Sequence, residues 1–148
     1  MVNPFDDTYF MKKALQEAET AYEKGEIPVG AVIVIENRII ARAHNLTELL
    51  VDVTAHAEMQ AITAASNYLG AKYLKECTLF VTLEPCNMCA GALFWSQVGK
   101  VVFGAADLKR GFIENGGKLH PKTEIVQGVL EQECAFLMTE FFKRKRNF

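Results

Sequence analysis

The chain has 148 residues, of which 50% are hydrophobic and 23% charged, a composition typical of one ordinary globular domain and unlike that of a disordered chain. A net charge of −2 argues against a general nucleic-acid coat, although it permits a local basic patch. No apolar run approaches the roughly 18 residues of a membrane span and no secretion signal opens the chain, so we expect a cytoplasmic protein without membrane contact.

Hydrophobic periodicity and turn residues predict nine elements in chain order. They are a helix over 8–24 capped by Asp7 or Thr8, a hairpin of strands 29–35 and 38–44, a helix over 54–68, a strand over 77–83, a helix over 85–97, strands over 100–105 and 123–127, and a helix over 130–146. Helices alternate with largely buried strands after the hairpin. The predicted class is therefore α/β, with one mixed sheet of about five strands and helices on both faces. No linker or repeat divides residues 1–148, so a single domain is expected.

Two cysteines lie three residues apart in "EPCNMC" at 84–89. Pro85 suits a first helical position, which places Cys86 and Cys89 in an opening turn whose dipole favours thiolate, the metal-binding form. A four-thiolate structural zinc site is disfavoured because Cys77 and Cys134 stand singly in a predicted strand and helix. A thioredoxin-like redox pair is disfavoured because that motif usually has no His-x-Glu upstream.

The stretch "TAHAEMQAI" at 54–62 supplies that His-x-Glu pair. On a helix, His56 and Glu58 would point roughly 200° apart, so they cannot ligate one metal together as an i, i+4 pair would. His56 with Cys86 and Cys89 gives three zinc ligands and leaves a fourth position for water, the coordination of a catalytic site with one Zn²⁺ per chain. Glu58 is then the general base. His-x-Glu followed by Pro-Cys-x-x-Cys is the signature of zinc deaminases.

Six segments resemble, in order and spacing, the bacterial tRNA-specific adenosine deaminases of the cytidine and deoxycytidylate deaminase superfamily. They are "IPVGAVIV" at 27–34, "HN" at 44–45, "TAHAEMQAI" at 54–62, "TLEPCNMCAGA" at 82–92, "VVFGAAD" at 101–107 and "FFKRKR" at 141–146. The resemblance implies a three-layer α/β/α cytidine-deaminase-like fold, a homodimer, and hydrolytic deamination of the wobble adenosine of a tRNA anticodon to inosine. The zinc ligands and the proton shuttle match at His56, Cys86, Cys89 and Glu58.

The resemblance also implies contacts with the tRNA anticodon loop. Asn45 matches a residue that hydrogen-bonds the flipped nucleoside, and Asp107 matches one near its ribose and backbone. Phe142 and the basic residues after it, Arg144 and Arg146 among them, match the helix that cradles the loop. Taken without the resemblance, "KRKR" at 143–146 fits equally well a solvated helix end that compensates the helix dipole.

Two features favour a free-base guanine or cytosine deaminase of the same superfamily instead. Trp95 matches a tryptophan of the guanine deaminases, and the segment after Gly111 is shorter than in the tRNA deaminases and lacks their "GSLM" stretch. The basic C-terminal helix favours RNA, because a small free base needs no phosphate-contacting tail. A zinc-stabilised binding subunit without turnover is the alternative from another class, and Glu58 argues against it because a structural site has no use for that carboxylate.

Overall fold

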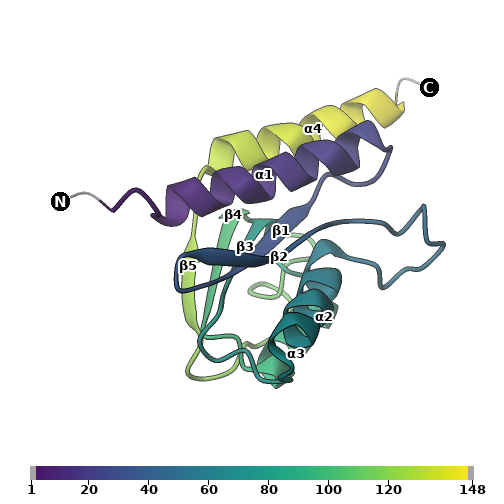
Figure 1. Cartoon of the computed structure of the whole chain (residues 1–148). Coiled ribbons are helices and arrows are strands. Elements are labelled where there is room, and N and C mark those ends of the chain that lie inside the picture. Colours follow the sequence, from purple (N-terminus) through teal and green to yellow (C-terminus); the bar gives the residue numbers. More distant parts are fainter. Residues whose placement is uncertain (1–2, 147–148) are drawn as a thin grey trace.

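The computed structural model describes residues 3–146, which form four helices and five strands (Figure 1). In chain order these are α1 (Asp7–Glu23), β1 (Gly30–Ile35), β2 (Arg38–His44), α2 (Ala57–Leu69), β3 (Thr78–Leu83), α3 (Asn87–Ser96), β4 (Lys100–Ala105), β5 (Glu124–Gln127) and α4 (Glu131–Arg146). Every predicted element is present. None of the helices in this described part of the chain is long and apolar enough to cross a membrane.

The five strands form one mixed sheet in the order β2-β1-β3-β4-β5. Strand β1 is antiparallel to both β2 and β3, whereas β3, β4 and β5 run parallel to one another. The hairpin between β1 and β2 turns on Glu36 and Asn37, whose φ angles are 50° and 61°. Two successive positive φ values give the two-residue turn whose twist matches that of the strands it joins. The prediction of a mixed five-stranded sheet is confirmed.

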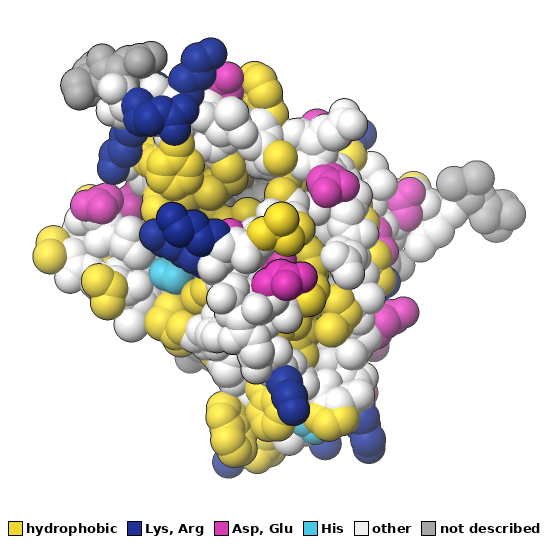
Figure 2. Space-filling view, turned by 180° about the vertical axis from the view of Figure 1, so that it is seen from behind, with side chains coloured by type: hydrophobic (Ala, Val, Ile, Leu, Met, Phe, Trp, Pro, Cys, Tyr) yellow, Lys and Arg dark blue, Asp and Glu magenta, His cyan; other side chains and the backbone are white. Residues whose placement is uncertain are grey.

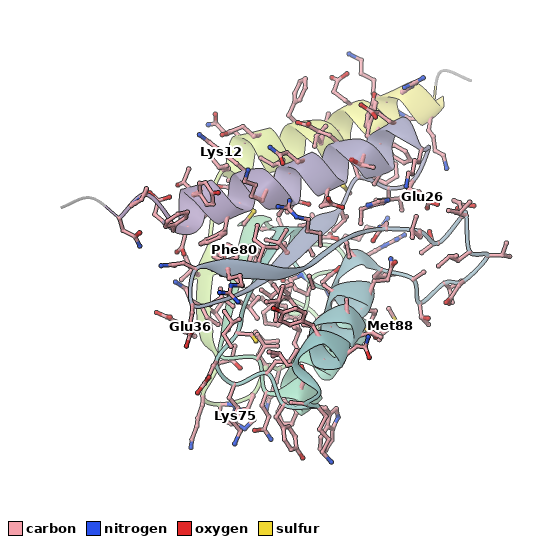
Figure 3. The ribbon with its side chains drawn as sticks, viewed as in Figure 1. Lys12, Glu26, Glu36, Lys75, Phe80 and Met88 are labelled. Carbon is pink, nitrogen blue, oxygen red and sulfur yellow. The ribbon has the colours of Figure 1, made fainter. Side chains whose placement is uncertain are left out.

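Helices cover both faces of the sheet, which makes the molecule three layers thick, as the sequence predicts (Figure 1). Helices α1 and α4 lie side by side on one face, and α2 and α3 lie on the other. Alternate strand residues face opposite layers because side chains alternate along a strand. Phe80 of β3, for example, points towards α1 (Figure 3), and its ring centroid lies 5.2 Å from that of Phe10. Its neighbour Leu79 is buried in the cluster that includes α2 and α3.

The structure corrects where three helices begin. The α1 cap is Asp6, whose side chain accepts a hydrogen bond from the Tyr9 amide at 2.8 Å, so the predicted caps Asp7 and Thr8 are wrong. Helix α2 begins three residues later than predicted, because His56 is extended, with a ψ of 154°. Helix α3 begins at Asn87 because Cys86 is extended too, with a ψ of 174°, so Pro85 precedes the N-cap and is not the first helical residue.

The topology brings several chain segments to one edge of the sheet. Strands β3 and β4 are parallel, so the segments that follow Leu83 and Ala105 leave the sheet at the same edge. Because β1 is antiparallel to β3 and to β2, the start of β1 and the end of β2 at His44 lie at this edge as well. Ligand sites of open α/β sheets form outside the carboxyl ends of the parallel strands. The edge is therefore the expected place for a functional site.

Candidate active site

Three metal-binding side chains meet at this edge of the sheet. The Sγ atoms of Cys86 and Cys89 lie 3.7 Å and 3.5 Å from Nδ1 of His56, and the three donor atoms all lie within 4.8 Å of one another. Donor atoms bound to tetrahedral zinc at about 2.0–2.3 Å are separated by roughly 3.5–3.8 Å. The spacing and the one-nitrogen, two-sulfur donor set therefore fit zinc with a fourth position left over.

Two of these side chains occupy the same position in different helices. His56 is the N-cap residue of α2 and Cys86 is the N-cap residue of α3, and neither side chain makes the usual capping hydrogen bond to its own helix. Both side chains turn towards the other helix start instead. Cys89 comes from the first turn of α3 and is fully buried. Two helix N-termini, each a centre of partial positive charge, thus converge on the sulfur atoms.

The two thiols share a proton in a way that suits metal binding. A hydrogen bond from the Cys89 thiol is the main cause that lowers the pKa of Cys86 to about 3, and the same bond raises the pKa of Cys89. The hydrogen bond with Cys86 also raises the pKa of His56. The lowered pKa of Cys86 favours its thiolate form, and a divalent cation that both cysteines ligate displaces the proton of Cys89.

Glu58 lies in the first turn of α2, beside the metal-binding group but outside the three-residue donor set. Its side chain is buried, with 4% of its surface exposed, yet it lines the cavity described below. Burial is the main cause that raises its pKa to about 7. A carboxyl group with a pKa near neutrality can both accept and donate a proton, which is the property of a general acid and base.

A cavity of about 420 Å³ opens onto these groups. It is lined by His56, Glu58 and Cys86, and by the aliphatic side chains of Ile27 and Val29 from the segment just before β1. This volume falls within the usual range of roughly 300–1,000 Å³ for small-molecule sites. Figure 2 shows a hydrophobic hollow on this side of the molecule, with Lys and Arg side chains beside the C-terminal end of α4 and again further down the same face.

The structure brings three of the predicted substrate residues to the cavity. Asn45, Asp107 and Phe142 all line it, from the end of β2, the segment after β4 and the last turns of α4. Asn45 is buried, and its side-chain oxygen accepts a hydrogen bond from the Ala57 amide at 2.8 Å, so it also fixes the start of α2. Phe142 is 41% exposed and is therefore not the core residue that its helical position alone would suggest.

The two predicted arginines lie outside the cavity. Arg144 lies over the ring of Tyr22, 5.7 Å from its centroid, in a small groove between α1 and α4. Arg146 is exposed at the last turn of α4. Trp95, the residue that favours a free-base deaminase, is 76% exposed and does not line the cavity either. The shortened segment after Gly111 is likewise absent from the cavity wall.

Three residues with a part in the site, and one buried glutamate outside it, were missed by the sequence reasoning. Lys109 and Arg110 line the cavity from the segment after β4. Glu84 and Glu26 are buried carboxylates, each accepting two backbone N–H groups from a loop near the cavity. Lys109 and Arg110 follow closely after Asp107, the last residue of the matching segment "VVFGAAD", and this position could have indicated that they line the cavity. Nothing in the local sequence distinguishes the two glutamates from solvated ones.

Comparison with known proteins agrees with this site. A model of the cytidine and deoxycytidylate deaminase zinc-binding region matches residues 5–105, which confirms the zinc cofactor and the deaminase class. The tRNA-specific adenosine deaminase of Bacillus subtilis is 49% identical, over 95% of this chain and 91% of that protein.

Two solved structures extend the comparison. A structure from studies of A-to-I editing by tRNA:A34 deaminases is 40% identical, with a TM-score of 0.82 over 88% of this chain and 99% of that chain. The guanine deaminase of Bacillus subtilis is 36% identical, with a TM-score of 0.66 over 75% of this chain and 68% of that chain. The chain therefore belongs to the zinc-binding cytidine and deoxycytidylate deaminase family and, within it, to the tRNA-specific adenosine deaminases.

Proposed function

We propose that the protein converts the wobble adenosine of a tRNA anticodon to inosine by hydrolytic deamination. The observation that carries the proposal is the buried carboxyl group of Glu58 beside a His-Cys-Cys donor set, in a cavity whose rim is both basic and aromatic. Lys109 and Arg110 supply the positive charge, and Phe142 supplies an aromatic face. Flipped bases of RNA loops are recognised by stacking and by contacts to phosphate, which such a rim provides.

In this proposal His56, Cys86 and Cys89 hold one zinc ion. Zinc in such a site polarises water, so that a nucleophile is available near neutral pH. Glu58 accepts the proton that the attacking water loses and delivers it to N1 of the adenine ring while the C6–O bond forms. Glu58 next takes the remaining proton from the new C6 hydroxyl group and passes it to the exocyclic amine, which leaves as ammonia when the C6–N bond breaks and the C6 carbonyl forms. One water is consumed and one ammonia released per inosine formed.

The chain's other residues bind and orient the nucleotide. Asn45 faces the cavity from the end of β2, where its amide group can hydrogen-bond the flipped nucleoside. Asp107 lines the cavity from the segment after β4, and the family resemblance assigns it to the ribose and its adjoining backbone. Phe142 provides a stacking face, and Arg144 and Arg146 extend the basic surface along α4 towards phosphates of the loop. Editing of tRNA also supports a cytoplasmic setting.

The basic end of α4 leads to a prediction about salt. Replacing Lys143, Arg144, Lys145 and Arg146 with glutamine should flatten the dependence of stem-loop binding on salt, because each phosphate contact contributes about 0.7 to the logarithmic slope for single strands. Four lost contacts lower the slope by as much as about 3. The measurement is the dissociation constant of an anticodon stem-loop at several salt concentrations, by fluorescence anisotropy.

A second four-site variant controls for net charge. Lys12, Lys72, Lys75 and Lys122 are exposed and do not line the cavity, so their change to glutamine removes the same charge from other places. This control should keep most of the slope. Equal slopes for the two variants would remove α4 from the RNA interface. Robust turnover of free guanine with none of the stem-loop would instead assign the protein to the free-base deaminases.

We also propose a homodimer. The loop between β2 and α2 exposes a run of aliphatic side chains, Val51 and Val53 being 90% and 85% exposed and Leu49 and Leu50 more than half exposed. A contiguous apolar surface of this kind is usually covered by a partner, and a second copy is the partner that the family resemblance implies. Sedimentation should give twice the monomer mass, and Val51→Asp with Val53→Asp should lower it.

A further inference from the structure

Glu84 ties a loop of the cavity wall to the segment that carries a metal ligand. It lies between the end of β3 and Cys86 and is 4% exposed. Oε1 accepts a hydrogen bond from the Asp107 amide at 3.0 Å, and Oε2 accepts one from the Ile113 amide at 3.0 Å. The two oxygens of one carboxyl group therefore hold both ends of the 107–113 loop.

Further contacts press the same loop against the same segment. The Phe112 amide donates to the Pro85 carbonyl at 2.9 Å, and Cys86 and Gly111 form an isolated antiparallel bridge. A Cβ atom on Gly111 would overlap the carboxyl group of Glu84, so the loop backbone packs directly on that group. The 107–113 loop is therefore joined to the segment before α3 by backbone contacts as well as by the Glu84 carboxyl group.

The loop carries the charged part of the cavity wall. Asp107, Lys109 and Arg110 line the cavity, and the Arg110 amide donates to the Asp107 carboxylate at 3.1 Å. The Gly111 amide also donates to the Asp107 carbonyl at 2.7 Å, which closes a tight turn. The directions of these three side chains therefore depend on where the loop backbone is held.

We propose that Glu84 is a positioning residue for substrate binding: it fixes the 107–113 loop so that Asp107, Lys109 and Arg110 face the bound nucleotide. The inference rests on the proposed function, in that the nucleotide is an adenosine of an RNA loop. Glu84 lines the cavity, but both of its oxygens already accept backbone N–H groups. Its effect is therefore on substrate affinity and not on proton transfer, which belongs to Glu58.

Glu26 provides a matched comparison elsewhere in the chain. It is 1% exposed, and its two oxygens accept the amides of Glu48 and Leu49 at 3.0 Å and 2.8 Å. Figure 3 shows Glu26 next to the loop that follows β2. Glu48 and Leu49 do not line the cavity, although Thr47 of the same loop does. The two glutamates thus make the same kind of clamp at similar burial, but Glu84 holds the amide of a cavity-lining residue, Asp107, and Glu26 does not.

The test is Glu84→Gln in zinc-loaded full-length protein, with Glu26→Gln as the control. Glutamine offers one acceptor oxygen in place of two, so one loop amide is left unpaired. We expect KM for an anticodon stem-loop to rise roughly tenfold, the loss of about one hydrogen bond to a charged group, while kcat and zinc content stay close to those of the wild type. Amide exchange should accelerate in 107–113. Glu26→Gln should accelerate exchange in 46–50 instead, with KM little changed.

Gly111→Ala disturbs the same loop from the other side, because its methyl group would overlap both the Glu84 carboxyl group and the Asp107 carbonyl oxygen. It should raise KM in the same direction, and it decides the matter if Glu84→Gln does not fold. An unchanged KM despite faster exchange in 107–113 would overturn the proposal. A loss of zinc in Glu84→Gln would also overturn it, and so would a rise in KM for Glu26→Gln equal to that for Glu84→Gln.

If the wild type fails to deaminate the stem-loop, the proposed function fails. In that case KM for free guanine is compared between Glu84→Gln and Glu26→Gln. Together with their amide exchange, this comparison tests the role of Glu84 separately.

Discussion

Replacing Glu58 with alanine is expected to lower turnover by roughly 10²–10⁴-fold, the usual contribution of a positioned general acid and base. Water and the leaving amine then lose the buried carboxyl group of the cavity wall that exchanges protons with them. Zinc should stay bound at one ion per chain, because Glu58 is outside the three-residue donor set. The measurement is single-turnover formation of inosine by the zinc-loaded variant, together with elemental analysis.

Glu58→Gln controls for the volume and the polarity of the site. Glutamine fills the same space and forms hydrogen bonds, but it cannot exchange a proton, so it should be as inactive as alanine. Its unfolding midpoint should not fall, because burial raises the pKa of Glu58 to about 7 and disfavours the ionised form in the folded state. The destabilisation caused by ionising Glu58 is absent at low pH and grows as the pH rises from the ordinary glutamate pKa of 4.5 to about 7. Near-normal single-turnover rates in either variant would show that another group moves the proton.

Replacing Cys86 with alanine is expected to weaken zinc binding by more than about 100-fold. Loss of a residue that merely hydrogen-bonds to a metal ligand already lowers metal affinity roughly 10–100-fold, and Cys86 is itself a ligand. The same change should lower the unfolding midpoint, because the metal joins the starts of α2 and α3 and its binding free energy contributes to folding. Elemental analysis after dialysis gives the zinc content, and thermal unfolding with and without chelator gives the stability.

Cys134→Ala is the matched control for the removal of a thiol. Cys134 is buried against Gly104, far along the chain from the donor set, so its loss should cost some packing but no zinc. In this variant the chelator should still lower the unfolding midpoint, whereas in Cys86→Ala it should have little further effect. Full zinc occupancy in Cys86→Ala would mean that other residues hold the metal.

The sequence predicts those parts of the site whose residues lie close together in the chain and form a short motif. His56 and Glu58 are two residues apart, and Cys86 and Cys89 are three apart, so each pair is recognisable before any folding is known. The hairpin is local too, because Glu36 and Asn37 tolerate positive φ between two aliphatic runs. Parallel pairing of β3 with β4 follows from the intervening helix.

The remainder depends on contacts between distant segments. The helix starts were misplaced because His56 and Cys86 take N-cap positions with their side chains turned towards a shared point. The role of Glu84 depends on amides more than twenty residues further along the chain, and helical position alone does not reveal that Phe142 faces the cavity. The direction of Arg144 is set by Tyr22 of another helix. In each of these cases the sequence around the residue does not indicate which distant segment it contacts.

The cavity is assembled from parts with separate origins. The metal ligands and Glu58 come from the starts of α2 and α3, whereas the rim comes from the 107–113 loop and the end of α4. Changes of rim side chains that keep the backbone hydrogen bonds of the 107–113 loop alter what the cavity holds without replacing a donor atom or Glu58. The arrangement therefore lets substrate choice diverge while the reacting groups stay the same.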